Sequence, residues 1–488
     1  MGTTRATTGV SDPSDDGRTG PPPRNPRLIA LIVATALLME NLDSSVLSTS
    51  LPQIAVDLGA NPIHLKLALT SYLLALAIFI PASGWAADRF GARLIFRLAI
   101  VIFAAGSIAC GLSSTLPELV AARVLQGMGG ALMVPVGRLV VLRSSPKAGL
   151  VGALAWLTVP ALIGPVIGPP LGGFVTTYFQ WRWIFWINVP IAVLGLTLAT
   201  IYIPDIRMDR ARAFDGRGFL LLGPGLVAAL TGLTVSGLGL APGLVIWSMT
   251  LAGFALVALY ARHAFRSDDP LIDLRLVRLP TFRISVGGGT LFRIGSGALP
   301  FLLPLMLQVG FGISAFQSGM LTFASGAGAL LMKFAAQPVL RRYGFRSTLI
   351  GNGILAALFI LSPAFFTAAT PAFVMVLVLL IGGFTRSLQF TALNAMAYAD
   401  VPTGKLSSAT SFSSVVQQLS ASFGITVAAF GLEAVAWLTG GPLLGADDFP
   451  WVFGLMAAIA LASVLAYVRI PAGAGSELLG RPPVREGD

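Results

Sequence analysis

Two carboxyl side chains lie inside the first long hydrophobic run of the chain, residues 28–47. Glu40 and Asp43 are spaced i and i+3, so they share one face of a helix. Two neighbouring carboxylates rarely both ionise in a low dielectric, so we expect one of them to accept a proton. Such a group can take up a proton or exchange it for a cationic substrate. For Glu40 a structural role is equally open, as a packing residue or one that reaches for the membrane surface.

Arg123 is the expected partner of Asp43. It lies in the fourth hydrophobic run, roughly 9 Å below the outer membrane face at 1.5 Å per residue, and Asp43 lies roughly 8 Å below the same face. An unpaired charge at this depth costs about 3 kcal/mol or more, so the two side chains should pair. A carboxylate whose charge depends on a movable arginine is a proton switch. A static structural ion pair is the alternative.

Hydrophobic helices must hold these residues. Of the 488 residues, 55% are hydrophobic and 11% are charged, and the mean hydropathy is +0.83. Such a chain cannot cover itself with a charged surface in water, whereas its apolar side chains can face lipid. Runs long enough to cross a bilayer recur fourteen times, at 28–47, 66–86, 94–112, 117–142, 148–175, 184–203, 217–238, 243–262, 282–307, 317–340, 346–368, 371–395, 406–436 and 449–470.

The basic residues orient these helices. With the N-terminus inside, the outer loops hold only Lys66 and Arg182 of the 32 Lys and Arg residues. Five lie within helices: Arg123, Arg138, Arg293, Lys333 and Arg386. The others fall in the tails and inner loops, which predicts two cytoplasmic termini. This spread over many loops also argues against nucleic-acid binding, despite the net charge of +11.

An internal repeat divides the chain. Residues 84–93, at the end of the second run, align with residues 337–346, at the end of the tenth, at an offset of 253. The loops at Pro146 and Pro402 give a similar offset of 256. Two parallel six-helix halves are therefore predicted, with substrate bound at their interface. The predicted organisation is a disordered tail (1–26), a first bundle (27–203), a linker with two extra helices (204–281), a second bundle (282–470) and a tail (471–488).

Five segments give the sequence a specific family resemblance. They are Glu40–Pro52, Gly84–Arg93, Leu119–Gly130, Leu162–Gly173 and Trp181–Pro190. Together they resemble the major facilitator superfamily, and within it the fourteen-helix drug:proton antiporter branch (EmrB/QacA-like), over nearly the whole chain. The resemblance implies an all-α membrane protein of two six-helix bundles plus two extra central transmembrane helices.

The resemblance also implies conformational roles. In the family, the loop at residues 84–93 latches the two halves together in the outward-facing state, although an ordinary positive-inside loop is the alternative here. Within it, Gly84 allows close helix approach and Gly91 a tight turn. The matching charged positions are Asp88, Arg89 and Arg93.

Two further motifs lie within helices. The fourth-helix motif includes Gln126 and Gly127. The GPxxGPxxGG string of the fifth helix is typical of the export branches; its glycines form a smooth packing stripe and its prolines favour a bend. These residues are Gly164, Pro165, Gly168, Pro169, Gly172 and Gly173.

Polar residues also occur within the second half. Intramembrane polar residues usually face the bundle interior or a cavity. The residues expected at the substrate cavity are Glu40, Arg293, Arg386, Gln389 and Asn394. The arginines alternatively bind acidic lipid headgroups. Lys333 is expected to snorkel, and Glu433 has no predicted role. A cavity holding carboxylates and arginines suits a zwitterion or an amphipathic acid as well as a cation.

These patterns indicate transport driven by a gradient. The sequence has no GxxxxGK[ST] loop, catalytic triad or metal-ligand spacing, so we expect no enzyme and no cofactor beyond a proton gradient. The favoured function is proton-coupled export of amphipathic drugs or toxic compounds. We expect a multi-pass monomer of the bacterial inner membrane, whose partners are small-molecule substrate, protons and lipid. An exporter of an endogenous metabolite or lipid, and a non-transporting membrane sensor, are the alternatives.

Overall fold

The structure is a computed structural model that describes residues 26–144, 150–204, 213–236, 242–402, 405–439, 445–471 and 473–479. Helices make up its regular structure: α1 (Pro26–Asp57), η1 (Pro62–Leu65), α2 (Lys66–Phe90), α3 (Ala92–Leu112), α4 (Leu116–Ser144), α5 (Leu150–Tyr178), α6 (Trp183–Trp186), α7 (Asn188–Tyr202), α8 (Gly216–Val235), α9 (Gly243–Arg266), η3 (Leu274–Arg278), α10 (Pro280–Gly297), α11 (Leu299–Leu305), η4 (Met306–Gly310), α12 (Ala315–Leu361), η5 (Ser362–Phe365), α13 (Ala372–Ala397), α14 (Leu406–Thr439), η7 (Ala446–Asp448), α15 (Phe449–Tyr467) and η8 (Ser476–Leu479). Nearly all of the predicted tail at 1–26 lies outside the described residues.

Twelve helical segments in the described part of the chain are long and apolar enough to cross a membrane. The chain is thus a multi-pass, all-helical membrane protein, but the predicted count of fourteen is not confirmed. Two features bear on the difference. The 29-residue α5 is not among the twelve. The 47-residue α12 is counted within a single segment, although a straight helix of that length would measure about 70 Å and a bilayer core measures about 30 Å.

The turns that follow α2 and interrupt α12 share an unusual backbone conformation. Gly91 has φ 96° and Gly344 has φ 75°, a region that glycine reaches without a Cβ penalty. The two residues occupy equivalent places in the predicted repeat, and the tight turn predicted at Gly91 is confirmed. Gly84 behaves differently, because no heavy atom lies within 4 Å of a Cβ built there. The close helix approach predicted at Gly84 is therefore wrong for this conformation.

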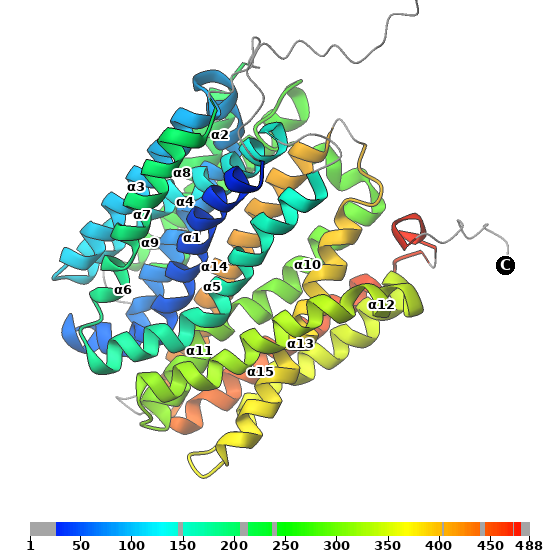
Figure 1. Ribbon diagram of the computed structural model, residues 1–488. Helices are drawn as coiled ribbons and strands as arrows, with labels where there is room; N and C mark the ends of the chain where they lie inside the picture. The colour runs from blue at the N-terminus through cyan, green and yellow to red at the C-terminus, as the bar shows by residue number, and fades with distance from the viewer. Residues whose placement is uncertain are drawn as a thin grey trace, which may run out of the picture.

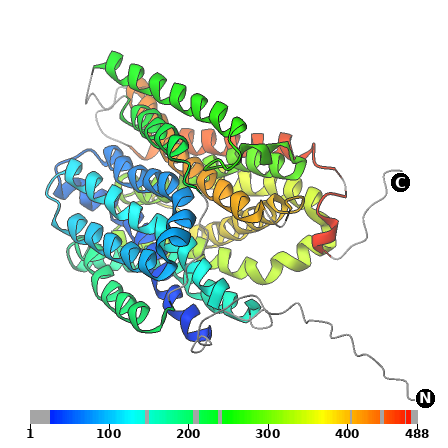
Figure 2. The ribbon, with the colours of Figure 1, turned by 90° about the horizontal axis from the view of Figure 1, so that it is seen from above.

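Helices α1–α7 and α10–α15 form two groups (Figures 1 and 2). We call the end where α1 finishes and α2 begins the distal end, and the end with the Gly91 turn the proximal end. In Figure 1 the two groups converge at the distal end and spread apart toward the proximal end. Polar contacts join them distally: Lys66 to Glu433 at 2.9 Å, Gln308 Nε2 to the Thr49 carbonyl at 2.9 Å, and the Phe316 amide to Thr177 Oγ1 at 3.0 Å.

Helix α1 continues ten residues beyond its predicted end at residue 47. The sequence there is rich in hydroxyl residues and includes Pro52, which lies inside the helix. Instead, the hydroxyls of Ser48, Thr49 and Ser50 donate to backbone carbonyls one turn earlier. Hydroxyls that bond within the helix have no need of solvent, so the helix runs on to Asp57.

The extra pair α8 and α9 lies along one edge of the bundle (green in Figure 2). Asp215 caps α8 by accepting from the Gly218 amide at 2.9 Å, and it also accepts from the Leu271 amide and contacts His263 Nε2 at 2.8 Å. Partial burial raises the pKa of Asp215, but these hydrogen bonds outweigh it and hold the pKa below its ordinary value. The capping carboxylate thereby joins the start of α8 to the end of α9.

Candidate proton and substrate sites

Asp43 lies at the centre of a buried polar cluster between α1, α3, α4 and α7. Its Oδ2 accepts from Arg123 Nη1 at 2.6 Å, so the predicted contact is present, and both side chains are 1% exposed. Its Oδ1 accepts from Gln126 Nε2 at 2.7 Å and from Asn188 Nδ2 at 2.8 Å. Gln126 also donates to Ser107 Oγ at 2.6 Å. A buried charge is thus paired and hydrogen-bonded on both oxygens, as burial demands.

The contacts of Asp43 make protonation a structural event. An ionised carboxylate accepts through both oxygens, whereas its protonated form must donate through one of them. Arg123, Gln126 and Asn188 all present N–H donors to Asp43. These donors occupy three of the roughly four lone-pair positions of the carboxylate, and a proton removes the negative charge that holds Arg123, so protonation weakens the contact between α1 and α4. The cluster can therefore convert proton binding into movement of α4 or α7 against α1.

Tyr72 connects Glu40 to this cluster. Its hydroxyl donates to Glu40 Oε1 at 3.4 Å, and its ring lies under the Arg123 guanidinium, 4.1 Å from ring centroid to Cζ. Glu40 is half-buried, and the neighbouring Asn41 Nδ2 lies 3.5 Å from Glu40 Oε2. Tyr72 thus contacts Glu40 directly and the Asp43 cluster through Arg123, and Glu40 is the more accessible of the two acidic residues.

Sequence reasoning missed Ser107, Asn188 and Tyr72. Asn188 belongs to the Trp181–Pro190 segment, where it begins α7 at 1% exposure. A polar amide inside the predicted sixth hydrophobic run, residues 184–203, was the available signal. Ser107 and Tyr72 gave no such signal, because single hydroxyls are common in membrane helices.

The glycines of α5 pack against α1. A Cβ at Gly164 would lie 2.9 Å from Asn41 Cβ, and one at Gly168 would lie 2.7 Å from Ser45 Cβ, so the helices touch through backbone. Ser45 Oγ crosses this contact to the Gly164 carbonyl at 3.1 Å. Gly172 continues the stripe toward Val46, whereas Gly173 faces α12 of the other half. The predicted packing stripe is thus present and lies beside the Asp43 helix.

Substitution of Gly168 by Leu is expected to destabilise the protein by about 1–3 kcal/mol, the usual range for overpacking. The side chain would collide with Ser45 and push α1 from α5. Gly84→Leu, which enters open space, is the matched control and should leave thermal stability unchanged. The melting temperature of each purified variant in detergent measures this, and equal values for both would contradict the packing role.

The charged residues of the loop at 84–93 bond within their own half. Asp88 pairs with Arg143 of α4 at 2.7 Å, and Arg93 donates to the Thr200 carbonyl of α7, while Arg89 is exposed. A latch between halves is therefore not engaged at Asp88 in this conformation.

A cavity of about 440 Å³ lies between the two halves. Arg386 borders it, as predicted, and so does Lys333. The snorkelling expected of Lys333 stays a prediction; its side chain is exposed, and its Nζ donates to Thr391 Oγ1 of α13 at 3.1 Å. Further lining residues are Asn41, Ser44, Ser45 and Ser48 of α1, Pro165, Val166 and Pro169 of α5, and Leu299, Leu303 and Phe390.

The other residues predicted at the cavity do not border it. Gln389 is fully buried and bonds to Asn352 and to the Leu349 carbonyl within the second half. Arg293, 4% exposed, donates to Asn394 Oδ1 at 3.1 Å. Glu40 turns toward Tyr72. Helix periodicity alone did not separate the cavity-facing side of these helices from the side that packs within a half.

Comparison with known protein families shows which family the chain belongs to. The sequence matches the model of the Major Facilitator Superfamily over residues 33–266 and 286–486. The chain belongs to this superfamily. It is therefore a membrane transporter by family, in agreement with the two groups of helices and the cavity between them.

Superfamily relatives cover nearly the whole chain. A protein of Serratia proteamaculans named "Putative multidrug resistance protein MdtD" is 38% identical over 90% of this chain and 93% of its own length. One of the same name from Salmonella typhimurium is 38% identical over 92% and 96%. Among solved structures, a D-xylose-proton symporter has a TM-score of 0.65 at 16% identity, with 91% of this chain and 98% of that one covered. The POT family transporter PepTSo has a TM-score of 0.67 at 15% identity, with the same coverage. These structures share the superfamily fold.

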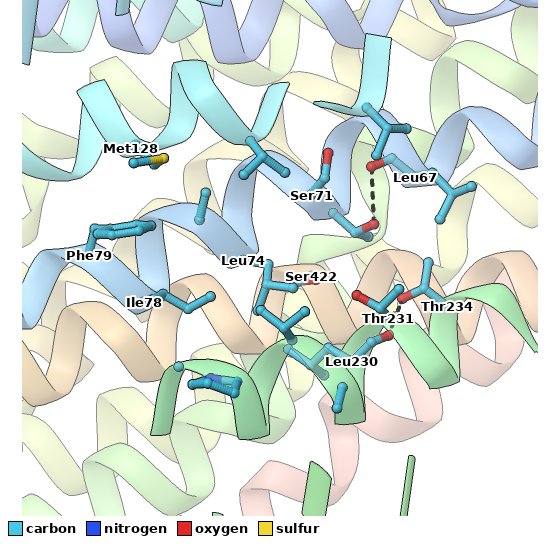
Figure 3. Close-up of a pocket in the computed structure, with 18 of the residues that line it drawn as sticks. Leu67, Ser71, Leu74, Ile78, Phe79, Met128, Leu230, Thr231, Thr234 and Ser422 are labelled. Carbon is cyan, nitrogen blue, oxygen red and sulfur yellow. Dashed lines mark hydrogen bonds between the residues drawn. The ribbon is translucent and has the colours of Figure 1, made fainter. Parts of the chain in front are cut away.

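A second hollow, of about 640 Å³, lies between α2, α4 and α8 (Figure 3). Its lining is almost wholly apolar, with Leu74, Ile78 and Phe79 of α2 facing Leu230 of α8. No charged side chain borders it in the described part of the chain. It suits hydrocarbon and offers nothing for proton exchange, so the Asp43 cluster and the central cavity are the candidate functional sites.

Proposed function

We propose that this protein is a proton-coupled exporter of amphipathic compounds. The observation that carries the proposal is the buried Asp43–Arg123 pair, because a proton on this carboxylate removes the charge that holds Arg123 in place. The Gly-Pro string of α5, packed on the same helix, fits an export branch. The relatives named as multidrug resistance proteins support drugs or toxic compounds as substrates.

The coupling follows from alternating access. The present conformation, joined at the distal end and spread at the proximal end, is the inward-facing one in our proposal. Substrate enters the central cavity from the cytoplasm, and the outward-facing state releases it. A proton then binds Asp43, loosens Arg123 or an amide, and permits the return. No nucleotide is required in this cycle.

We further propose fourteen crossings by a monomer in the bacterial inner membrane, with both termini cytoplasmic. The division of α12 at Gly344 and the length of α5 support two crossings beyond the twelve. The distribution of Lys and Arg supports the orientation. The extra pair α8 and α9 covers the seam between the halves, because α8 lies beside α2 and its Thr234 contacts Thr426 of α14 at 3.1 Å.

Inverted membrane vesicles test the coupling. With an acid interior generated by respiration, addition of substrate should release protons, reported by a pH-sensitive dye. Vesicles without the protein and vesicles treated with a protonophore are the controls. Absence of substrate-dependent proton release for compounds that the purified protein binds would overturn the proposal.

A further inference from the structure

The central cavity is bordered by two cations and by no acid. Lys333 of α12 and Arg386 of α13 both line it, and no Asp or Glu does so among the described residues. Neither cation forms an ion pair in the described part of the chain; Arg386 Nη2 donates to Ser325 Oγ at 3.1 Å and Lys333 Nζ to Thr391 Oγ1 at 3.1 Å. Hydroxyls satisfy donors but leave the charge unbalanced.

The two cations lie at similar depth. Lys333 follows the start of α12 by eighteen residues and Arg386 follows the start of α13 by fourteen. At 1.5 Å per residue this difference is about 6 Å. Each donates to a hydroxyl on the other helix, which holds both side chains at the α12–α13 surface facing the cavity. One ligand headgroup can therefore meet both.

The rest of the second half offers no counter-charge nearby. Its acidic residues from 282 to 470 are Asp400, Glu433, Asp447 and Asp448, all at or near helix ends. Glu433 is already paired with Lys66. A third cation, Arg293, is buried in the same half with a neutral partner, Asn394, and its Nε has no hydrogen bond. The field on this side of the cavity is therefore positive.

The opposite wall is neutral. Ser44, Ser45 and Ser48 of α1 present hydroxyls there and Val166 of α5 presents apolar surface, while Leu303 of α11 and Phe390 of α13 add apolar surface on the side of the cations. A ligand that suits these walls carries negative charge at one end and an apolar body. Unbalanced cations inside a membrane protein usually mark a substrate path, and carboxylate or phosphate is the group that arginine and lysine recognise.

We infer that the transported substrate is an amphipathic organic anion whose carboxylate, sulfonate or phosphate headgroup binds between Lys333 and Arg386. This rests on the proposed function and names its substrate class. Exit of an anion from a cell is also favoured by the inside-negative membrane potential. An anionic phospholipid has the same headgroup chemistry, and the test separates the two sources.

Two xanthene dyes of opposite charge form the test pair, carboxyfluorescein as the anion and rhodamine 6G as the cation. Binding to the purified protein in phosphatidylcholine nanodiscs is measured by fluorescence anisotropy. Carboxyfluorescein should bind at least tenfold more tightly than rhodamine 6G. Lys333→Gln and Arg386→Gln should each weaken carboxyfluorescein binding tenfold or more. Arg283→Gln, at the exposed start of α10, removes an equal charge outside the cavity and should have no effect.

A charge-reversal variant distinguishes a specific loss of anion binding from a loss caused by misfolding, because a misfolded protein would not gain binding of a cation. Lys333→Glu should exchange the preference and bind rhodamine 6G more tightly than the parent protein does. Preference of the parent protein for rhodamine 6G, or anion binding unchanged by both neutral variants, overturns the inference. A lipid result would also overturn it. If phosphatidylglycerol copurifies with the parent protein but not with Arg386→Gln, and carboxyfluorescein does not bind, the site holds lipid and not a transported anion.

Proton release in vesicles remains a separate measurement. Anion binding that depends on Lys333 without proton coupling would overturn the proposed function and leave the substrate class standing. Proton release driven by rhodamine 6G alone would support proton-coupled export and overturn the anionic substrate class.

Discussion

Replacement of Asp43 by Asn is expected to abolish proton-driven accumulation of substrate while exchange of substrate across the membrane persists. Asn retains the shape of Asp43 but cannot bind a proton, so the return step loses its dependence on pH. It also leaves Arg123 buried without its counter-charge, and removal of one partner from a buried ion pair typically destabilises a protein by about 3–5 kcal/mol. We therefore expect a lower melting temperature together with the lost coupling. Uptake into inverted vesicles driven by a pH gradient, compared with counterflow without one, separates the two activities.

Asp57→Asn is the matched control for this experiment. Asp57 lies on the same helix and also pairs with an arginine, Arg182, at 2.6 Å, but its side chain is 44% exposed. Exposed pairs contribute about 0–1 kcal/mol, so this variant should keep both coupling and stability. Full gradient-driven uptake by Asp43→Asn would refute the role of Asp43 as the proton site, and equal losses in both variants would indicate a general effect of charge on α1.

The sequence was sufficient to predict the features fixed by the membrane. Apolar runs gave the helices, since a bilayer demands internally bonded segments of a set length. Depth matching gave the Asp43–Arg123 contact, because charges at one depth in a low dielectric have few alternatives to pairing. The glycine stripe of α5 followed from its spacing, and the neighbouring helix α1 supplied the surface that the stripe required.

Other features depend on which face of a helix meets which neighbour. Gln389 and Arg293 are polar and intramembrane like Arg386, yet they bond within their own half. Lys333 borders the cavity and donates to a hydroxyl of the neighbouring helix α13. The length of α1 was also underestimated, because its serine and threonine hydroxyls donate hydrogen bonds to backbone carbonyls within the helix. Such outcomes arise from tertiary contacts that periodicity does not encode.

The contact of Lys66 with Glu433 was the least expected ion pair. The sequence predicts an outer-loop position for Lys66 and no role for Glu433. Instead, Lys66 begins α2, is fully buried under the Phe430 ring at 4.8 Å, and reaches Glu433 of α14 in the other half. The pair therefore exists only while the distal ends of α2 and α14 are together.

Glu433→Gln is accordingly expected to favour the state that is open at the distal end. Without Glu433, Lys66 is a buried charge with no counter-charge in the closed state. Opening of the distal end relieves this cost, so the closed state is destabilised relative to the open one. We expect the free-energy difference between the closed and open states to shift by about 2–3 kcal/mol toward the open state. This is at or below the usual cost of breaking a buried ion pair, because Glu433 is partly hydrated. The shift corresponds to a change of about 30- to 150-fold in the equilibrium constant. A cysteine at Leu303, buried beside the cavity, reports opening through its rate of reaction with a membrane-impermeant maleimide applied from the distal side. The native Cys110 is fully buried in this structure.

Two further variants decide whether the buried charge is the cause. Asp447→Asn, an exposed residue at the same end, makes a similar charge change and should leave the labelling rate as it was. Lys66→Met combined with Glu433→Gln removes both charges and leaves an apolar contact, which is often as stable as the buried pair it replaces. The double variant should therefore return labelling toward the parent rate. Equal labelling of the parent and Glu433→Gln would show that the ion pair does not hold the distal end closed, whereas fast labelling of the double variant would show that closure needs the pair itself.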